Sequence, residues 1–222
     1  MIISKFNKIE INKKMCMDNK YNFRLETLFY DDSENKDEWQ NEVYLKAKKI
    51  SEEEGLYKIF DFGCGSGYKV IKYFGDKDYS IFMYDFKKTI EFVKNKYEYL
   101  DNINFIEAES GFNKKIECDI VIMADVIEHV LDPNNLINIV LKNINFKYLV
   151  VSTPDRGILY DESSEYYYGP PKNIHHIREW SFSEFRYYFL NNFGHLNILE
   201  HYISNYYQKT QCIVLKNNMD II

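Results

Sequence analysis

YKIFDFGCGSG, residues 57–67, joins a short apolar run to an acid and then to three glycines at alternate positions. The apolar run is typical of a buried strand that ends where the glycines begin. Glycines let the backbone approach a ligand closely, and open parallel sheets bind ligands at the carboxyl ends of their strands. The stretch therefore predicts a ligand-binding loop at one edge of an α/β sheet.

Three kinds of loop compete for this stretch. A phosphate-binding P-loop requires G-x-x-x-x-G-K-[ST], and no glycine here stands at that spacing. A dinucleotide loop requires G-x-G-x-x-G, which Gly63 and Gly65 begin but Tyr68 fails to complete. The third kind of loop follows a strand that ends in an acid and has the pattern G-x-G-x-G, and residues 57–67 match it without adjustment. The acid in such a loop suits a cationic ligand. Taken alone, the loop is also compatible with simple packing of a helix against a strand.

The rest of the chain alternates between strand and helix patterns. Five strands are predicted, at 56–62, 79–85, 103–107, 118–125 and 146–154. Helices are predicted at 36–54, 87–100, 133–144 and 181–194. Near-continuous apolar strands separated by helices are typical of βαβ units in a parallel sheet. Two further strands, 196–204 and 210–217, are joined by a short turn and predict an antiparallel pair at one end of the sheet.

We interpret this pattern as a single α/β domain over 36–222, preceded by a polar N-terminal arm over 1–35. The segment 155–180 shows little periodicity and is long for an idle connection. Long irregular segments in compact domains often carry function. We therefore expect 155–180 to be a lid or a substrate-binding loop.

Composition restricts the partners and the compartment. The formal net charge of −6 argues against nucleic acid as a partner, because binding to a phosphate backbone needs Lys and Arg. The four cysteines are scattered, and the N-terminus lacks the apolar core of a secretory signal. No stretch is apolar enough to span a membrane. These features predict a cytoplasmic protein. We expect no metal, because no carboxylate and histidine cluster shows ligand spacing along the chain.

Three segments carry a resemblance to a known family. DFGCGSG (61–67), MYDF (83–86) and DIVIMADVIEHVLDP (119–133) resemble motifs of class I S-adenosylmethionine-dependent methyltransferases, in the small-molecule branch that includes ubiquinone-biosynthesis-like enzymes. The resemblance implies a Rossmann-like, seven-stranded, mostly parallel sheet of order 3-2-1-4-5-7-6, with the last strand antiparallel and helices on both faces. The cofactor would be S-adenosylmethionine, and the product S-adenosylhomocysteine.

The same resemblance implies a set of cofactor-binding residues. It places the methionine part on the glycine loop and after the fourth strand, the ribose on Asp85, the adenine ring on Phe86 and the adenine amine near Glu107. A carboxylate about 20 residues beyond the glycines also suits ribose hydroxyls on general grounds. The full set is Asp61, Gly63, Cys64, Gly65, Asp85, Phe86, Glu107, Ala124, Asp125 and Val126. The helix 36–54 is implied to cover the cofactor, with Trp39, Gln40 or Tyr44 facing it.

The candidates for the chemistry lie after the fourth strand and in 155–180. A hydroxyl acceptor gains from a base with a pKa near neutrality, and histidine is the usual choice. We expect His176 to be that base, with His129 in an orienting or catalytic role. Arg178 could bind a phosphate or carboxylate through its planar fork. His175 and Asp155 complete the predicted acceptor site.

The sequence thus predicts methyl transfer to a small polar acceptor, most simply a sugar oxygen. H-x-R-E-W (176–180) and STPDR (152–156) resemble methyltransferases of surface-glycan biosynthesis, which would make the acceptor a capsule or lipopolysaccharide precursor, such as a nucleotide-linked sugar. The alternatives are a methyltransferase for a quinone or lipid, an NAD-dependent sugar oxidoreductase or epimerase, and a nucleoside-binding protein without catalysis.

Overall fold

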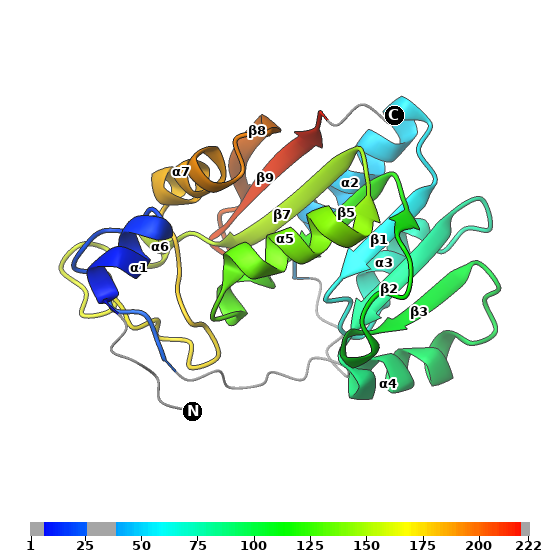
Figure 1. Ribbon diagram of the computed structural model, residues 1–222, viewed down its shortest axis with the longest axis horizontal. Coiled ribbons are helices and arrows are strands. Elements are labelled where there is room, and N and C mark those ends of the chain that lie inside the picture. Colours follow the sequence, from blue (N-terminus) through cyan, green and yellow to red (C-terminus); the bar gives the residue numbers. More distant parts are fainter. Residues whose placement is uncertain (1–6, 26–38, 219–222) are drawn as a thin grey trace.

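The apolar segments of the chain form one seven-stranded sheet. The computed structural model describes residues 7–25 and 39–218. The sheet has the order β3-β2-β1-β5-β7-β9-β8 (Figure 1). Its strands are β1 (Lys58–Phe62), β2 (Ser80–Asp85), β3 (Ile103–Glu107), β5 (Ile120–Ala124), β7 (Tyr148–Pro154), β8 (Leu196–Asn205) and β9 (Thr210–Asn217). All neighbours pair in parallel except β7 with β9 and β8 with β9. The predicted order and the antiparallel pair are confirmed.

Helices cover both faces of the sheet. One hydrophobic cluster lies under α2 (Asn41–Glu54), α3 (Tyr68–Phe74) and α4 (Lys87–Tyr97). A second cluster lies on the opposite face, under α5 (Pro133–Asn143) and α7 (Phe182–Asn192). Successive side chains of β1 point to opposite faces of the sheet, so Ile59 belongs to the first cluster and Phe60 to the second. In Figure 1, α5 lies across the front of the sheet, with α2 and α3 behind it.

Several short elements were not predicted from the sequence. Helix α3 was missed because it follows the glycine loop directly and begins at the residue after Gly67. A two-stranded sheet pairs β4 (Ile116–Glu117) with β6 (Ile144–Asn145). The remaining short elements are η1 (Ala108–Ser110), η2 (Ile127–His129) and α6 (Arg156–Leu159). The predicted helix over 36–54 begins at Asn41 in the structure, and 36–38 lie outside the described residues.

Part of the predicted N-terminal arm packs into the core. It contains α1 (Lys8–Lys14), and Met15, Met17 and Tyr21 belong to the hydrophobic cluster under α5 and α7. The Trp180 indole donates to the Met15 carbonyl at 2.9 Å, and the Tyr21 hydroxyl accepts from the Glu179 amide at 2.9 Å. Residues 1–6 and 26–35 of the arm lie outside the described part of the chain. The arm therefore supports the segment that ends at Trp180.

The segment 155–180 is anchored at several points along its length. Arg156 forms an ion pair with Glu184 of α7. The amide of Ile177, a fully buried residue, donates to the carbonyl of Glu128 at 2.8 Å. That bond holds His176 beside η2, the short turn that follows β5. In the described part of the chain, no helix has the length and apolar character that would cross a membrane.

Candidate functional site

A cavity of about 650 Å³ opens at the carboxyl ends of β1, β2, β5 and β7. Its size lies in the usual range for small-molecule sites. Seven of the ten predicted cofactor residues line it: Gly63, Cys64, Asp85, Phe86, Ala124, Asp125 and Val126. The other three, Asp61, Gly65 and Glu107, are not among the lining residues. The carboxyl ends of the strands thus carry the site, as the glycine loop predicted.

The glycine loop needs its first glycine for two reasons. Gly63 has a φ of +79°, a left-handed conformation that side chains disfavour. A Cβ on Gly63 would also lie 2.6 Å from Cγ2 of Val126, a stiff β-branched residue of the cavity wall. The bare backbone therefore brings the loop against the segment after β5.

We expect Gly63→Ala to lower the affinity for S-adenosylhomocysteine by about tenfold or more, because the new Cβ would displace Val126 from the cavity wall, and overpacking of this kind costs ~1–3 kcal/mol. Titration calorimetry of the variant measures the loss. Gly55→Ala is the matched control, because Gly55 has a φ of +64° with no atom within 4 Å of its Cβ position. The control should lose stability with unchanged affinity, and an equal loss of affinity in both variants would contradict this account.

Two carboxylates lie close to the glycine loop. Oδ2 of Asp85 accepts from the Gly65 amide at 2.9 Å, and its Oδ1 accepts from the Phe86 amide at 2.7 Å. Asp61 is buried and accepts from the Tyr44 hydroxyl of α2 at 2.9 Å. Asp85 thus lines the cavity and also holds the glycine loop in place. Gly65 does not line the cavity, but its amide donates to Asp85. Asp61 does not line the cavity, whereas Tyr44, which donates to it, does.

The predicted adenine contacts separate in the structure. Phe86 lies at the cavity and is 50% exposed, so a ring face is accessible to a planar ligand. Glu107 ends β3 in register with Asp85, but its carboxylate accepts from Ser110 at 3.4 Å and it does not line the cavity. The position of Glu107 therefore does not support the predicted contact with the adenine amine.

Asp125 is held in a strained turn after β5. Its φ is +53°, a conformation that aspartate adopts more readily than most residues. Ser152 donates to its Oδ1, and Gln40 donates to its Oδ2 at 3.0 Å. Loss of solvation raises the pKa of Asp125. Gln40 and Trp39 also line the cavity, so the start of α2 reaches the site.

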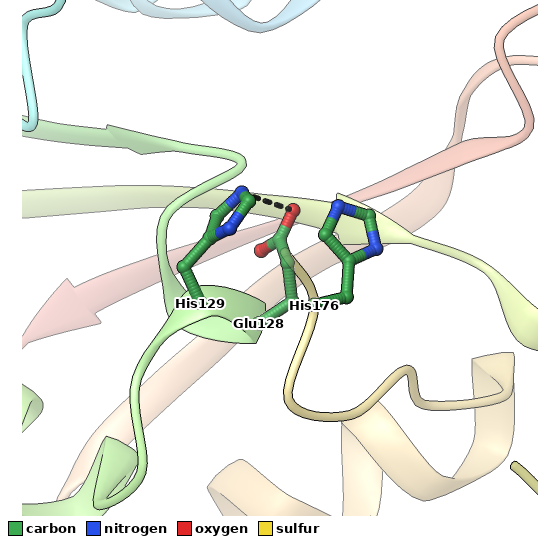
Figure 2. A group of neighbouring side chains, drawn as sticks. All are labelled: Glu128, His129 and His176. Atoms are coloured by element: carbon green, nitrogen blue, oxygen red, sulfur yellow. Dashed lines mark ion pairs between the residues drawn. The ribbon is translucent and has the colours of Figure 1, made fainter. Parts of the chain in front are cut away.

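Three residues of the cavity lining, Glu128, His129 and His176, lie close together (Figure 2). Glu128 and His129 come from η2, and His176 comes from the segment 155–180. Burial, and next the charge of Asp125, raise the pKa of Glu128 well above its usual value. Burial, and next His176, lower the pKa of His129 to about 4. His129 is therefore neutral at pH 7.

This group corrects the expectation that no carboxylate and histidine cluster has ligand spacing. One oxygen or nitrogen from each of the three side chains lies within 4.8 Å of the others. Spacing along the chain could not reveal the group, because His176 is far from η2 in sequence. The pair Glu128–His129 was itself visible in the sequence, but Glu128 was not among the predicted site residues.

The predicted acceptor residues divide between the cavity and the core. His175 and His176 line the cavity. Arg178 is buried, its guanidinium donates to the carbonyls of Val130 and Leu131 at 3.1 and 2.9 Å, and it does not line the cavity. Burial lowers the pKa of Arg178 to about 10. These contacts tie 155–180 to the chain after η2, so Arg178 is not placed to bind an anionic acceptor.

Asp155 also lies outside the cavity. It is buried and caps α6, and its Oδ1 accepts from the Gly157 amide at 2.8 Å. Other polar residues line the cavity that sequence reasoning did not assign: Lys69, Asn173, Gln208 and Thr210. Gln208 and Thr210 come from the turn between β8 and β9 and the start of β9, where no motif marks them.

Comparison with known proteins agrees with this arrangement. A family model described as a methyltransferase domain matches residues 24–211. No sequence among the curated proteins compared matches the chain. The methyltransferase domain of bacterial CtHen1 has a TM-score of 0.58 at 18% identity, with 80% of this chain and 97% of that chain covered.

Two other solved structures share the fold at low identity. A S-adenosylmethionine-dependent methyltransferase from Clostridium acetobutylicum has a TM-score of 0.57 at 14% identity, covering 82% of this chain and 93% of that one. The plantazolicin methyltransferase BamL, in complex with S-adenosylhomocysteine, has a TM-score of 0.57 at 13% identity, covering 81% and 85%.

The chain thus has the sheet order of these methyltransferases, and its cavity lies at the glycine loop, the acid at the end of β2 and the turn after β5. The cofactor is S-adenosylmethionine, and the family excludes the nicotinamide-dependent alternative. With most of its length matched, from residue 24 to residue 211, the chain belongs to the methyltransferase-domain family.

Proposed function

We propose that this methyltransferase transfers the methyl group of S-adenosylmethionine to a hydroxyl oxygen of a small polar acceptor, and that the hydroxyl belongs to a sugar. The observation that carries the proposal is the pair of imidazoles, His129 and His176, in the cavity that most of the predicted cofactor residues also line. Their ring centroids are 4.8 Å apart. Transfer to oxygen gains from a group that withdraws the hydroxyl proton, whereas the sulfonium donor needs only orientation.

The direction of the imidazoles supports a role at the acceptor. Nδ1 of His176 donates to Glu179 at 2.6 Å, so Nε2 is the nitrogen that carries the lone pair. That atom would act on the hydroxyl either directly, as a base, or through a bound cation. Asn173, His175 and Gln208 add polar groups to the same cavity, which favours a hydroxylated acceptor over a quinone or a lipid.

The choice of a sugar rests on the polar lining and on the resemblance of 152–156 and 176–180 to surface-glycan methyltransferases. The fold by itself selects no acceptor, because the structures with the same fold include RNA repair and plantazolicin methyltransferases. The net charge of −6 favours a small acceptor over nucleic acid. Four free cysteines are consistent with action in the cytoplasm.

The test is formation of S-adenosylhomocysteine with a panel of acceptors, followed by mass and NMR analysis of the product. The panel contains nucleotide-linked sugars, free oligosaccharides, a short RNA, a quinol and a peptide. We expect turnover with a sugar hydroxyl and a new O-methyl group in the product. Turnover with the quinol or the peptide alone would overturn the acceptor class, and turnover with RNA alone would overturn the exclusion of nucleic acid.

A further inference from the structure

The side chains of Glu128, His129 and His176 converge on one point of the cavity wall. Figure 2 shows the two imidazoles on either side of the carboxylate, with His129 and Glu128 from the turn after β5 and His176 from the opposite segment. Nε2 of His129 lies 4.0 Å from Oε1 of Glu128. The two rings meet nearly at right angles, with an interplanar angle of 83°. Two nitrogens and one oxygen thus face a shared volume.

Each of the three side chains is oriented by a partner on its other side. Nδ1 of His129 donates to the His175 carbonyl at 3.0 Å, and Nδ1 of His176 donates to the Glu179 carboxylate at 2.6 Å. Neutral imidazole has one donor and one acceptor nitrogen, so both lone pairs lie on Nε2. Metal-binding histidines in proteins nearly always donate their other ring N–H to a carbonyl or carboxylate in this way.

Glu128 follows the same pattern. Its side chain is fully buried, and its Oε2 accepts from the Thr153 hydroxyl at 3.1 Å. Its Oε1, the atom that faces His129, is buried and has no hydrogen-bond partner in the described part of the chain. A buried carboxylate oxygen without a partner is costly unless a cation or a proton compensates it. The unsatisfied oxygen is thus aimed at the point where both imidazoles present Nε2.

We propose that Oε1 of Glu128, Nε2 of His129 and Nε2 of His176 bind a divalent first-row transition cation. Two imidazoles and one carboxylate suit Mn²⁺, Fe²⁺, Co²⁺ or Zn²⁺, whereas Mg²⁺ and Ca²⁺ prefer oxygen ligands alone. The cavity beside the group leaves coordination positions for water and for the acceptor.

Binding requires a small closure of the site. Metal–ligand bonds of about 2.1 Å hold ligand atoms at most about 4.2 Å apart, and the three atoms here lie within 4.8 Å of one another. Side-chain rotation covers that difference. The amide of Asn173, an exposed residue, donates to Nε2 of His176 at 2.9 Å in this structure, and a cation would replace that donor.

The role of the cation rests on the proposed function. A bound cation lowers the pKa of a coordinated hydroxyl and fixes its direction. The acceptor oxygen then forms a bond to the methyl carbon, the C–S bond breaks, and its electron pair stays on sulfur as S-adenosylhomocysteine. The hydroxyl proton leaves to water. Under this arrangement His176 serves as a ligand, and the cation replaces it as the group that activates the hydroxyl.

The first experiment measures the metal alone, without cofactor or acceptor. The full chain is stripped with a chelator and titrated with MnCl₂ by calorimetry, and with CoCl₂ by visible absorption. We expect one ion per chain and a cobalt spectrum with nitrogen ligands. Glu128→Gln and His176→Asn should each weaken Mn²⁺ binding by at least ~100-fold, beyond the range for loss of an orienting partner. Thr153→Val should weaken it by about 10–100-fold.

Controls separate a lost ligand from a damaged fold. His195→Asn removes an exposed histidine outside the cavity and should bind Mn²⁺ like the wild type. Every variant is checked by circular dichroism and by its affinity for S-adenosylhomocysteine, which should stay unchanged. Absence of binding to the wild type, or equal binding by Glu128→Gln, would overturn the site.

The second experiment tests the role in catalysis. With an acceptor identified, chelation should abolish turnover while S-adenosylhomocysteine still binds, and Mn²⁺ or Co²⁺ should restore it. Full turnover in the chelator would overturn the catalytic role of the cation. Because Mn²⁺ binding is measured without a reaction, failure of the proposed acceptor chemistry and failure of the metal site give different results.

Discussion

Asp85→Ala is expected to lower the affinity for S-adenosylhomocysteine by at least ~100-fold while the fold is retained. The Asp85 carboxylate lines the cavity and accepts from the amides of Gly65 and Phe86 at 2.9 and 2.7 Å. A carboxylate has about four acceptor sites, so both oxygens can also accept from the two ribose hydroxyls. Each hydrogen bond to a charged group is worth about 1.5–3 kcal/mol, and two of them correspond to about 10²–10⁴ in affinity.

Calorimetry with S-adenosylhomocysteine measures the effect, and circular dichroism checks the fold. Asp101→Ala is the matched control, because Asp101 is exposed in the turn after α4, outside the cavity. Asp85→Asn should fall between wild type and Asp85→Ala, since the amide keeps one acceptor oxygen but loses the charge. Wild-type affinity in Asp85→Ala would show that this carboxylate does not meet the cofactor.

His176→Ala is expected to reduce kcat by about 10²–10⁴ and to change the affinity for S-adenosylhomocysteine by less than about twofold. His176 lies in the cavity but comes from 155–180, away from the glycine loop and Asp85. In the proposed function its imidazole acts on the acceptor, so its loss should affect the chemical step and spare cofactor binding. The prediction holds whether Nε2 takes the proton directly or binds a cation.

The substitution also removes the partner of Glu179, a buried carboxylate that accepts from Nδ1 of His176. A stranded buried acceptor costs about 1–3 kcal/mol, so the thermal midpoint of the variant must be measured beside its activity. Adding Glu179→Gln to His176→Ala limits that cost. The exposed His195 gives the control variant His195→Ala. A wild-type rate in folded His176→Ala would contradict the assignment.

The strength of the local signals explains how well the fold was predicted. β3 and β9 have the predicted bounds, because apolar residues and turn signals mark both ends of each strand. The helices α4, α5 and α7 begin within one residue of prediction. At α7, Ser181 and Glu184 form a capping box, which is a local signal for the start of a helix. The missed elements, such as α3 and the β4–β6 pair, are short, and their residues carry little periodicity.

Charged residues in 155–180 show the limit of sequence reasoning. Arg178 and Asp155 have the chemistry of a binding site, and sequence alone gave no sign that they would be buried. The structure uses them to fasten the segment, through the carbonyls after η2 and the cap of α6. A side chain's partners are set by contacts between distant segments, which leave no periodic trace.

The sequence by itself determined the sheet and the glycine loop, because both depend on neighbouring residues: apolar periodicity and a bare backbone after a strand that ends in an acid. The cofactor followed from the resemblance of three short segments to a known family, and these segments are likewise local. Only the tertiary structure decided which residues of 155–180 line the cavity. The bond from the Ile177 amide to the Glu128 carbonyl brings His176 against Glu128 and His129, and no spacing rule connects residues so far apart in the chain. The three side chains that we propose to bind a metal meet only in the folded protein, because the fold brings two segments that are distant in sequence together.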